Sequence, residues 1–429
     1  MKLESWGRYP KYPQAASPVW WPQQLDAAAL PQSFLPFGNG RSYGDVCLAS
    51  SNQLLTMRGL DRFVAFDRQT GVLRAEAGVT LGDILQVTVP AGWFLPVVPG
   101  TRLATLGGAI ANDVHGKNHH RQGTFGCHVN RFTLYRQGQW LECSPQQEPD
   151  VFAATIGGLG LTGIIVAAEI QLMPIKTGQI DTVTQRFDRL EDFFRLANDY
   201  DLSHQYGVAW IDCLARGSRQ GRGVYFAGNH AEYESPMTIH QRQLAIPLTP
   251  PLSLVNRVSL KVFNELYWYT KPKQPVVSRE PYPGYFFPLD GIQHWNRLYG
   301  RNGFQQYQCV IPDNGATDAM RELLSAIADA QSGSFLAVMK KCGDVSSPGL
   351  LSFPLAGTSL ALDFPQSSKT EKLFERLDAI TRSAGGRLYP AKDAHMSAAD
   401  FQSFYPQWQA LDALRDPSIS SHFWKRVTL

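Results

Sequence analysis

Three glycine clusters in the first 165 residues could bind a ligand through the protein backbone. They are Gly38-Asn39-Gly40-Arg41-Ser42-Tyr43-Gly44-Asp45, the run from Pro99-Gly100-Thr101 to Thr105-Leu106-Gly107-Gly108-Ala109-Ile110-Ala111, and Gly157-Gly158-Leu159-Gly160-Leu161-Thr162-Gly163-Ile164-Ile165. Glycine accepts the positive φ values that a loop needs when it presents several backbone N–H groups to an anion. Small residues also let the backbone approach a flat ligand closely. The clusters therefore suit a ligand that carries phosphate and a planar ring.

A single glycine cluster is more often a turn than a phosphate site. None of the three has the Rossmann G-x-G-x-x-G in its strand-to-helix setting, and none is followed by the G-K-[ST] of a Walker loop. A nicotinamide or nucleotide triphosphate site is thus disfavoured. Together, the clusters suggest a long cofactor laid across several loops, such as a dinucleotide with a fused ring system.

The pattern of predicted strands and helices that must position these loops changes near residue 176. Residues 31–175 alternate short β-type runs with glycine clusters, which predicts a compact α+β domain. After it come segments that predict a helix (187–201), a strand (206–214), a strand (304–312), a helix (318–331), two strands (335–343 and 359–365) and a helix (371–386). That order predicts an antiparallel sheet covered by helices on one face. Residues 229–283 between them are irregular and proline-rich, which predicts a lid or a disordered loop.

The bulk composition excludes several classes of protein. A chain of 429 residues suits two domains. A formal net charge of +3, from 40 basic and 37 acidic side chains, gives no reason to propose nucleic-acid binding. None of the six cysteines forms a C-x-x-C pair, which favours free thiols in a reducing compartment. The N-terminus lacks the apolar region of a secretory signal, and no stretch is long and apolar enough to span a membrane. We therefore expect a cytoplasmic protein.

The same motifs carry a resemblance to a known family. GNGRSYGD, PGTxxxTxGGAIAxDxHGKNHH and GGxGLTGII resemble the FAD-binding domain of the vanillyl-alcohol-oxidase class, also called the p-cresol-methylhydroxylase (PCMH) type. More narrowly, they resemble the decaprenylphosphoryl-β-D-ribose 2′-oxidase family. The similarity continues through VAWIDC, PLDGIQHWNRLYG, FQQYQCVIP, SFLAVMKKCG, LALDFP and GGRLYPAKD, and it is weak over 229–283.

This resemblance implies a two-domain α+β flavoprotein. Residues 1–177, completed by 386–429, would bind FAD, and 178–385 would form an inserted substrate domain with an irregular loop at about 229–283. The family pattern places the pyrophosphate on the first two clusters, and the flavin ring between His115-Gly116 and the substrate domain, near Ile164. The cofactor residues it implies are Gly38, Asn39, Gly40, Arg41, Ser42, Tyr43, Gly44, Pro99, Gly100, Thr101, Thr105, Gly107, Gly108, Ala111, His115, Gly116, Gly160, Gly163, Ile164 and Tyr389.

The resemblance also nominates residues for chemistry on the substrate. Lys392 comes first, because a desolvated lysine facing a flavin loses its proton more easily and could act as a base or as a cation that steadies the reduced flavin. Lys117 and His115 follow. The substrate residues it implies are Trp210, Gln306, Gln308, Lys340, Ala361 and Asp363. His115, His119 and His120 lack an H-E-x-x-H pattern, so we predict no metal.

Two positions depart from the family pattern. Arg41 stands where many members of the wider class carry the histidine that attaches flavin covalently, so we predict non-covalent FAD. Ala361 stands where mycobacterial relatives carry cysteine. Hydride transfer does not need a thiol, so catalysis need not suffer, and thiol-directed inhibition at this position should be absent.

The implied reaction is FAD-dependent oxidation of the 2′-hydroxyl of a polyprenyl-phospho-β-D-ribose. A separate short-chain NAD(P)H-dependent keto-reductase would complete the epimerisation to arabinose. The alternatives are a free-sugar or aldonolactone oxidase of the same class, and a non-catalytic flavin-fold scaffold. The apolar runs within 229–283, with scattered lysine and arginine, suit either peripheral contact with a lipid chain or the inner membrane, or a loop that simply covers the substrate domain.

Overall fold

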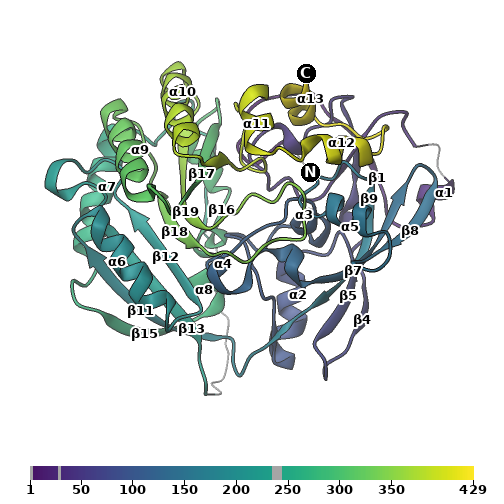
Figure 1. Cartoon of the computed structure of the whole chain (residues 1–429), viewed down its shortest axis with the longest axis horizontal. Helices are drawn as coiled ribbons and strands as arrows, with labels where there is room; N and C mark the ends of the chain where they lie inside the picture. The colour runs from purple at the N-terminus through teal and green to yellow at the C-terminus, as the bar shows by residue number, and fades with distance from the viewer. Residues whose placement is uncertain (1–2, 28–29, 234–243) are drawn as a thin grey trace.

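The structure is a computed structural model that describes residues 3–27, 30–233 and 244–429, and it forms two lobes that lie side by side (Figure 1). One lobe, coloured purple to blue, comes from the first part of the chain and carries the yellow C-terminal helices. The other lobe, in teal and green, comes from the middle of the chain. Each lobe combines a largely antiparallel sheet with helices, so the predicted α+β class is confirmed.

The first lobe centres on a five-stranded antiparallel sheet with the order β4-β5-β9-β7-β8. Its strands are β4 (Phe63–Phe66), β5 (Val72–Glu76), β7 (Val129–Arg136), β8 (Gln139–Cys143) and β9 (Ile164–Gln171). A smaller parallel sheet holds β1 (Ala15–Pro18), β3 (Gln53–Thr56) and β2 (Leu35–Phe37), and β6 (Trp93–Phe94) pairs with β10 (Met173–Pro174). The helices are α1 (Gln24–Ala27), α2 (Leu81–Thr88), α3 (Leu106–Ala111), α4 (His119–Gln122) and α5 (Pro149–Thr155). The first five residues of central β9, 164–168, are all buried and all apolar, whereas Glu169 and Gln171 are partly exposed.

The second lobe is built on an eight-stranded sheet with the order β15-β11-β13-β12-β18-β19-β17-β20, in which every pair is antiparallel. Its strands are β11 (Gln179–Phe187), β12 (Tyr206–Ile211), β13 (Gly223–His230), β15 (Val276–Pro281), β17 (Phe304–Pro312), β18 (Val338–Cys342), β19 (Gly357–Pro365) and β20 (Arg387–Leu388). Helices α6 (Leu190–Asp201), α9 (Ala316–Ala330) and α10 (Ser368–Ser383) cover one face, as predicted (Figure 1). None of the helices in the described ranges is long and apolar enough to cross a membrane.

Strand periodicity divides the side chains of this sheet between two environments, because successive residues point to opposite faces. Tyr307 and Cys309 of β17 join the core beneath the helices, whereas Gln306 and Gln308 point away from it. The opposite face is therefore free to carry polar residues. It forms one wall of the cavity described below.

The segment 229–283 differs from the prediction of an irregular loop. Its described part contains β14 (Leu244–Ala245), the helix α7 (Arg257–Tyr269) and edge strand β15, and it leads into α8 (Tyr282–Phe286). The side chain of Asn256 accepts hydrogen bonds from the backbone of Val258 and Ser259, forming a capping box that starts α7. The prolines lie outside the helix and mark its limits. Residues 234–243 of this segment lie outside the described residues.

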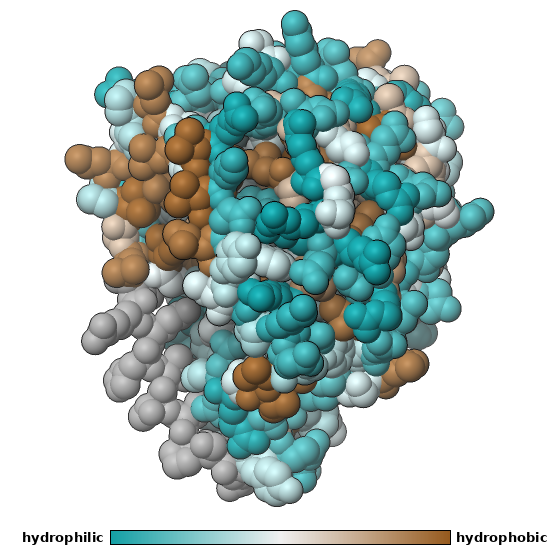
Figure 2. Space-filling model, turned by 90° about the vertical axis from the view of Figure 1, so that its left-hand side faces the viewer, coloured by the Kyte–Doolittle hydropathy of each residue, from teal (hydrophilic) through white to brown (hydrophobic). Residues whose placement is uncertain are grey.

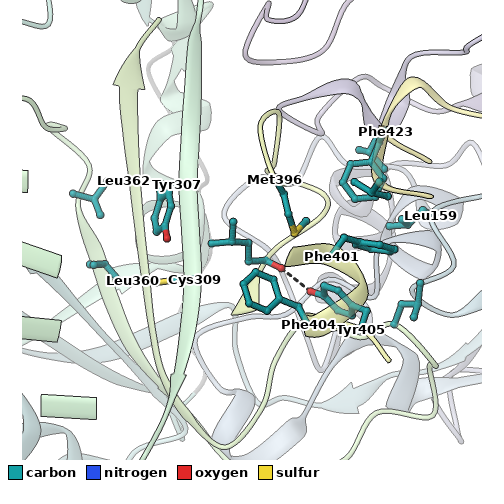
Figure 3. Close-up of a cluster of buried hydrophobic side chains, with 14 of the residues drawn as sticks. Leu159, Tyr307, Cys309, Leu360, Leu362, Met396, Phe401, Phe404, Tyr405 and Phe423 are labelled. Carbon is teal, nitrogen blue, oxygen red and sulfur yellow. Dashed lines mark hydrogen bonds between the residues drawn. The ribbon is translucent and has the colours of Figure 1, made fainter. Parts of the chain in front are cut away.

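The C-terminal helices join the two lobes through a shared core. They are α11 (Ala398–Phe404), α12 (Trp408–Leu414) and α13 (His422–Thr428). Figure 3 shows Phe401, Phe404 and Tyr405 on one side of this core and sheet residues such as Tyr307 and Leu360 on the other. The hydroxyl of Tyr405 donates a 2.6 Å hydrogen bond to the carbonyl oxygen of Leu388 (Figure 3). The stretch just before α11, which carries Lys392, is therefore held between the lobes.

The predicted domain boundaries lie close to the limits of the large sheet. Strand β11 begins at Gln179, and β20 ends at Leu388, a little beyond the predicted boundary at 386. The division of the chain into a cofactor domain and a substrate domain stays a prediction.

Candidate active site

A cavity of about 1040 Å³ lies where the two lobes meet. Its wall includes the three glycine clusters, the stretch from His115 to Lys117, and the polar face of the large sheet. A single drug-sized ligand typically occupies a pocket of roughly 300–1,000 Å³. The cavity is therefore large enough for an extended cofactor with a second molecule beside it.

The structure brings nearly all of the predicted site residues into this one wall. From the first lobe and the 386–429 stretch these are Gly38, Asn39, Gly40, Arg41, Ser42, Tyr43, Pro99, Gly100, Thr101, Thr105, Gly107, Gly108, Ala111, His115, Gly116, Lys117, Gly160, Gly163, Tyr389 and Lys392. From the second lobe they are Trp210, Gln306, Gln308, Lys340, Ala361 and Asp363.

Gly44 and Ile164 are the two predicted residues that do not line the cavity. A Cβ at Gly44 would lie 1.7 Å from the carbonyl oxygen of Asp393, so this glycine allows the first cluster to pack against the Lys392 loop. Ile164 is buried in the core, whereas its neighbour Ile165 lines the cavity. Adjacent residues of a strand face opposite ways, so Ile164 and Ile165 lie in different environments. Contact of Gly44 and Ile164 with the cofactor stays a prediction.

The first two glycine clusters pack directly against each other. A Cβ at Gly38 would lie 2.4 Å from Oγ1 of Thr105, and the side-chain amide of Asn39 donates a 2.8 Å hydrogen bond to the carbonyl oxygen of Leu103. Thr105 is the N-cap of α3 and accepts a hydrogen bond from the backbone N–H of Gly108. This packing produces a continuous surface with few side chains, as the sequence suggested.

His115 links the first lobe to two strands of the second. Its Nδ1 lies 2.6 Å from Nζ of Lys340 on β18, and its Nε2 lies 3.2 Å from the side-chain amide nitrogen of Gln308 on β17. Burial, together with the nearby cation of Lys340, holds the pKa of His115 well below its usual value. The imidazole is therefore neutral at physiological pH and serves as a hydrogen-bonding partner.

Lys392 is half-buried and lines the cavity. Its Nζ lies 3.8 Å from the centroid of the Tyr43 ring, and the backbone N–H of Tyr43 donates to the carbonyl oxygen of Ala391 at 3.0 Å. Burial lowers the pKa of Lys392, while the carboxylate of Asp363 opposes that shift. Burial raises the pKa of Asp363, which accepts a 2.6 Å hydrogen bond from Gln306. A lysine in this setting can hold or release a proton near neutral pH.

Lys117 lies against the aromatic segment that follows β15. Its ammonium donates to the carbonyl oxygen of Tyr285 and stands 4.1 Å from the centroid of the Tyr285 ring. Burial lowers the pKa of Lys117 to about 7, although the carboxylate of Glu280 acts in the opposite direction. Burial likewise lowers the pKa of Lys340 to about 8. Both lysines carry a charge that is costly in this cavity, and a bound anion would offset that cost.

The remaining predicted residues form the walls around these groups. The indole N–H of Trp210 donates to the carbonyl oxygen of Phe335 at 2.9 Å, and its ring meets that of Tyr267 at 4.7 Å. Ala361 pairs with Gln308 across β17 and β19 and adds no polar group. Tyr389 donates to the carbonyl oxygen of Asn112 at 2.9 Å. In the part of the chain that the structure describes, no group of histidines, cysteines and carboxylates is placed to hold a metal.

Asp290 and Asn112 are cavity residues that the sequence did not reveal. Asp290, from the second lobe, accepts hydrogen bonds from the hydroxyl of Thr101 and from the backbone of Arg102, both at 2.8 Å. It therefore fixes the second glycine cluster from across the cavity. The PLDG motif contained Asp290, but only the fold shows which loop it meets.

The unpaired polar atoms of the wall fit a polar, planar cofactor. Among the described residues, the buried atoms Nε of Arg41, Oδ1 of Asn112 and Oη of Tyr285 line the cavity without a hydrogen-bond partner. Buried polar groups normally have partners, so a ligand is expected to supply them. Together with the glycine-lined surface, these atoms fit FAD.

Comparisons with known proteins agree with this site. Residues 26–144 match the FAD binding domain family. A decaprenylphosphoryl-β-D-ribose oxidase from Mycolicibacterium smegmatis is 34% identical over 412 residues, which cover 91% of this chain and 88% of that protein. A protein from Streptomyces coelicolor is 32% identical over 361 residues, covering 79% of this chain and 96% of that protein. An L-gulonolactone oxidase from Scyliorhinus torazame is 28% identical over 138 residues, covering 32% of this chain and 31% of that protein.

The first of these relatives matches both lobes, whereas the lactone oxidase matches only about a third of the chain. The cavity between the lobes needs residues from both, so full-length similarity is the more informative. The chain belongs to the decaprenylphosphoryl-β-D-ribose oxidase family and is an FAD-dependent oxidoreductase.

Proposed function

We propose that this enzyme oxidises the 2′-hydroxyl of a polyprenyl-phospho-β-D-ribose to a ketone, the first half of an epimerisation to the arabinose form. The observation that carries the proposal is the group of half-buried lysines at 117, 340 and 392 on the wall of a cavity that both lobes build. Five cationic side chains line the cavity (Arg41, Lys117, Lys271, Lys340 and Lys392) against three carboxylates (Glu280, Asp290 and Asp363). This excess suits bound anions, both the pyrophosphate of FAD and the negatively charged phosphodiester of the proposed substrate. The full-length relative named for the same ribose supports the sugar.

The proposed chemistry divides between the cofactor and the chain. When bound, FAD supplies a hydride acceptor for the carbon that carries the hydroxyl. Neutral Lys392 would accept the proton of that hydroxyl, and burial makes the neutral form accessible by lowering its pKa. Gln306, held by Asp363, would orient the sugar, and Lys340 and Lys117 would meet its phosphate and hydroxyls.

The proposal also assigns a task to each domain. Residues 1–177 with 386–429 would hold FAD, because they supply the glycine clusters and Tyr389. Residues 178–385 would hold the sugar, because their strands supply Trp210, Gln306, Gln308, Lys340, Ala361 and Asp363. A ligand that fills the space between the two domains would displace the water there.

We expect the FAD to be released when the protein is denatured. Arg41 lines the cavity with its guanidinium 4.4 Å from the centroid of the Trp6 ring, and an arginine cannot form the histidyl bond of covalent relatives. After acid precipitation, the yellow flavin should therefore remain in the supernatant. Colour retained in the washed pellet would contradict non-covalent binding.

We expect binding of an anionic sugar to weaken as the pH rises. Lys117, with a pKa of about 7, and Lys340, with a pKa of about 8, are cationic only below those values. An anion stabilises the protonated forms, so binding near pH 8 should take up protons, and each lost cation should weaken binding about tenfold. Calorimetric titrations in buffers of different ionisation enthalpy measure this uptake. A neutral free sugar is the control, and a pH-independent affinity for the anionic one would refute the assignment.

A partner enzyme follows from the product. The ketone must be reduced to give the epimer, and the sequence contains no nicotinamide-binding fingerprint. We therefore propose a separate short-chain NAD(P)H-dependent keto-reductase. A lipid-linked substrate also supports a cytoplasmic location with peripheral contact at the inner membrane, which we retain as part of the proposal.

The deciding experiment is anaerobic mixing of the yellow holoenzyme with candidate substrates. A short-chain prenyl-phospho-ribose should bleach the flavin absorbance, whereas free ribose and an aldonolactone should do so far more slowly. Faster bleaching by the lactone would favour the alternative of a free-sugar or lactone oxidase. No bleaching by any sugar would favour a non-catalytic scaffold.

A further inference from the structure

Helix α7 presents an unusual apolar face to solvent. Val258, Val262, Leu266 and Tyr269 follow one another at helical spacing and are 55–71% exposed. Three exposed leucines precede the helix: Leu248, Leu252 and Leu254. Figure 2 shows apolar side chains gathered at the upper left of the molecular face that contains this part of the second lobe. Single exposed apolar residues are ordinary, but a contiguous group of this kind marks an interaction site. We call these four helix residues the apolar face of α7.

Folding of the chain does not require this face, because α7 is anchored by its other side. Leu260, Asn264 and Trp268 are buried, and the amide of Asn264 donates a 2.7 Å hydrogen bond to Asp212. The indole N–H of Trp268 donates to the carbonyl oxygen of Phe187 at 3.0 Å. A surface helix usually buries one apolar stripe and exposes polar residues. Here both sides are apolar, so the outer one is available to a partner.

The charges beside the apolar face are basic. Arg257 and Lys261 are exposed on α7, and neither has a carboxylate partner among the residues that the structure describes. The one acidic residue of the helix, Glu265, has a partly exposed side chain whose charge is paired with Arg222 at 2.8 Å. An apolar stripe flanked by cations is the composition that binds an anionic lipid surface.

The same helix borders the active-site cavity. Tyr267 and Lys271 line the cavity, and Trp268 packs in one cluster with Trp210 of its wall. A molecule held at the apolar face of α7 would therefore have only the thickness of one helix between it and the cavity. If a substrate consists of a sugar attached to a long apolar chain, the chain can lie at the apolar face of α7 while the sugar lies in the cavity.

We propose that the apolar face of α7 docks the enzyme on an anionic lipid bilayer, so that the polyprenyl chain stays in the membrane while its sugar enters the cavity. This inference rests on the proposed function, which supplies the lipid-linked substrate. Docking is peripheral: the apolar face meets the interface, and Arg257 and Lys261 meet the lipid phosphates.

Flotation with vesicles tests the docking directly. The holoenzyme is mixed with vesicles of equal parts phosphatidylcholine and phosphatidylglycerol, or of phosphatidylcholine alone. The wild type should float with the anionic vesicles, and the double variant Val262→Glu/Leu266→Glu should lose about tenfold or more of that binding, since it places charges in the interface. The matched control is Val64→Glu/Leu202→Glu, which changes two exposed apolar residues elsewhere. Equal loss in both variants, or no binding by the wild type, would overturn the inference.

A second measurement separates this inference from the proposed function. Val262 and Leu266 do not line the cavity, so the α7 variant should keep its FAD and oxidise a soluble short-chain prenyl-phospho-ribose at the wild-type rate. With a long-chain substrate in anionic vesicles, its kcat/KM should fall about tenfold. Failure of both substrates in the wild type would reject the function, whereas equal rates on vesicles would reject only the docking. If the variant instead converts a dimer into a monomer without changing vesicle binding, the face joins two copies and the inference is wrong.

Discussion

Replacing Lys392 with alanine should leave FAD bound and slow reduction of the flavin by substrate about 10²–10⁴-fold, the usual contribution of a positioned acid or base. The half-buried lysine lies beside Tyr43 and near Asp363, and its pKa is lowered mainly by desolvation. Removing its side chain takes away the only lysine on the stretch between Tyr389 and α11. Stopped-flow absorbance under anaerobic conditions measures the rate, and the flavin spectrum of the purified variant measures cofactor content.

Two further variants make the Lys392 result specific. Lys341→Ala removes a lysine from β18 that pairs with Asp313 and does not line the cavity, so it should reduce flavin at the wild-type rate. Lys392→Arg keeps the positive charge but cannot accept a proton, because a guanidinium stays protonated. Activity retained by the arginine variant would assign Lys392 a cationic role, and lost activity would assign it the base. Normal rates in Lys392→Ala would remove this residue from the mechanism.

Replacing Arg426 with alanine should lower the stability of the enzyme by about 3 kcal/mol, the lower end of the cost of breaking a buried ion pair by removing one partner. Arg426 lies on α13 and donates hydrogen bonds to Asp45 at 2.8 and 3.0 Å and to Asp393 at 2.9 Å. Both carboxylates are 2% exposed, so the variant would leave Asp45 without this cation and Asp393 paired only with His395. Thermal unfolding of the holoenzyme should show a midpoint several degrees lower.

The neighbouring residue provides the control for Arg426. Lys425 is exposed on the same helix, and its replacement by alanine should change stability by less than about 0.5 kcal/mol. Arg426→Lys should recover part of the loss, since an ammonium can meet one carboxylate but not both in the same geometry. Because Asp393 follows Lys392 in the chain, the alanine variant should also lose part of its activity. Equal unfolding midpoints for Arg426→Ala and the wild type would show that the ion pairs contribute nothing.

The ion pairs of Asp393 with Arg426 and His395 should also make the stability of the enzyme depend on pH. Burial raises the pKa of Asp393, but Arg426 and His395 lower it more, so its pKa is below the ordinary value. Its contribution is present above the unfolded carboxyl pKa and is lost as the pH falls. Burial lowers the pKa of His395, but Asp393 and Asp378 raise it more, so its contribution is present below the unfolded imidazole pKa and is lost as the pH rises. Both contributions are complete only between about pH 4 and 6.5, where the network should stabilise most.

The active site was predictable where local pattern decides which way a side chain points. The family resemblance named Gln306 and Gln308 of β17 with Ala361 and Asp363 of β19, and in the structure all four lie on the sheet face that lines the cavity. At Ile164 the sequence could not decide the face, because the residues at the start of β9 are apolar on both faces, and in the structure its neighbour Ile165 lines the cavity.

The secondary structure of segment 229–283 was not predicted from the sequence. Its prolines and apolar runs predicted an irregular loop, yet the structure forms α7 and pairs β15 with β11. The prolines on both sides of the helix, which favour turns and loops, obscured the helical pattern of Arg257–Tyr269. The partners that order this segment, such as Asp212 for Asn264, lie elsewhere in the chain.

The sequence by itself determined the class of cofactor and the family, because glycine-rich backbone and strand alternation are local properties and the motifs extend over both lobes. The tertiary structure alone decided how the residues act on one another. Lys340 contacts His115 although the two are 225 residues apart in the sequence. Asp290 accepts a hydrogen bond from Thr101, which is 189 residues away. The lowered pKa values of the lysines arise from burial between two lobes, and burial is a property of the assembled fold. The burial of these lysines therefore cannot be read from any single stretch of the sequence.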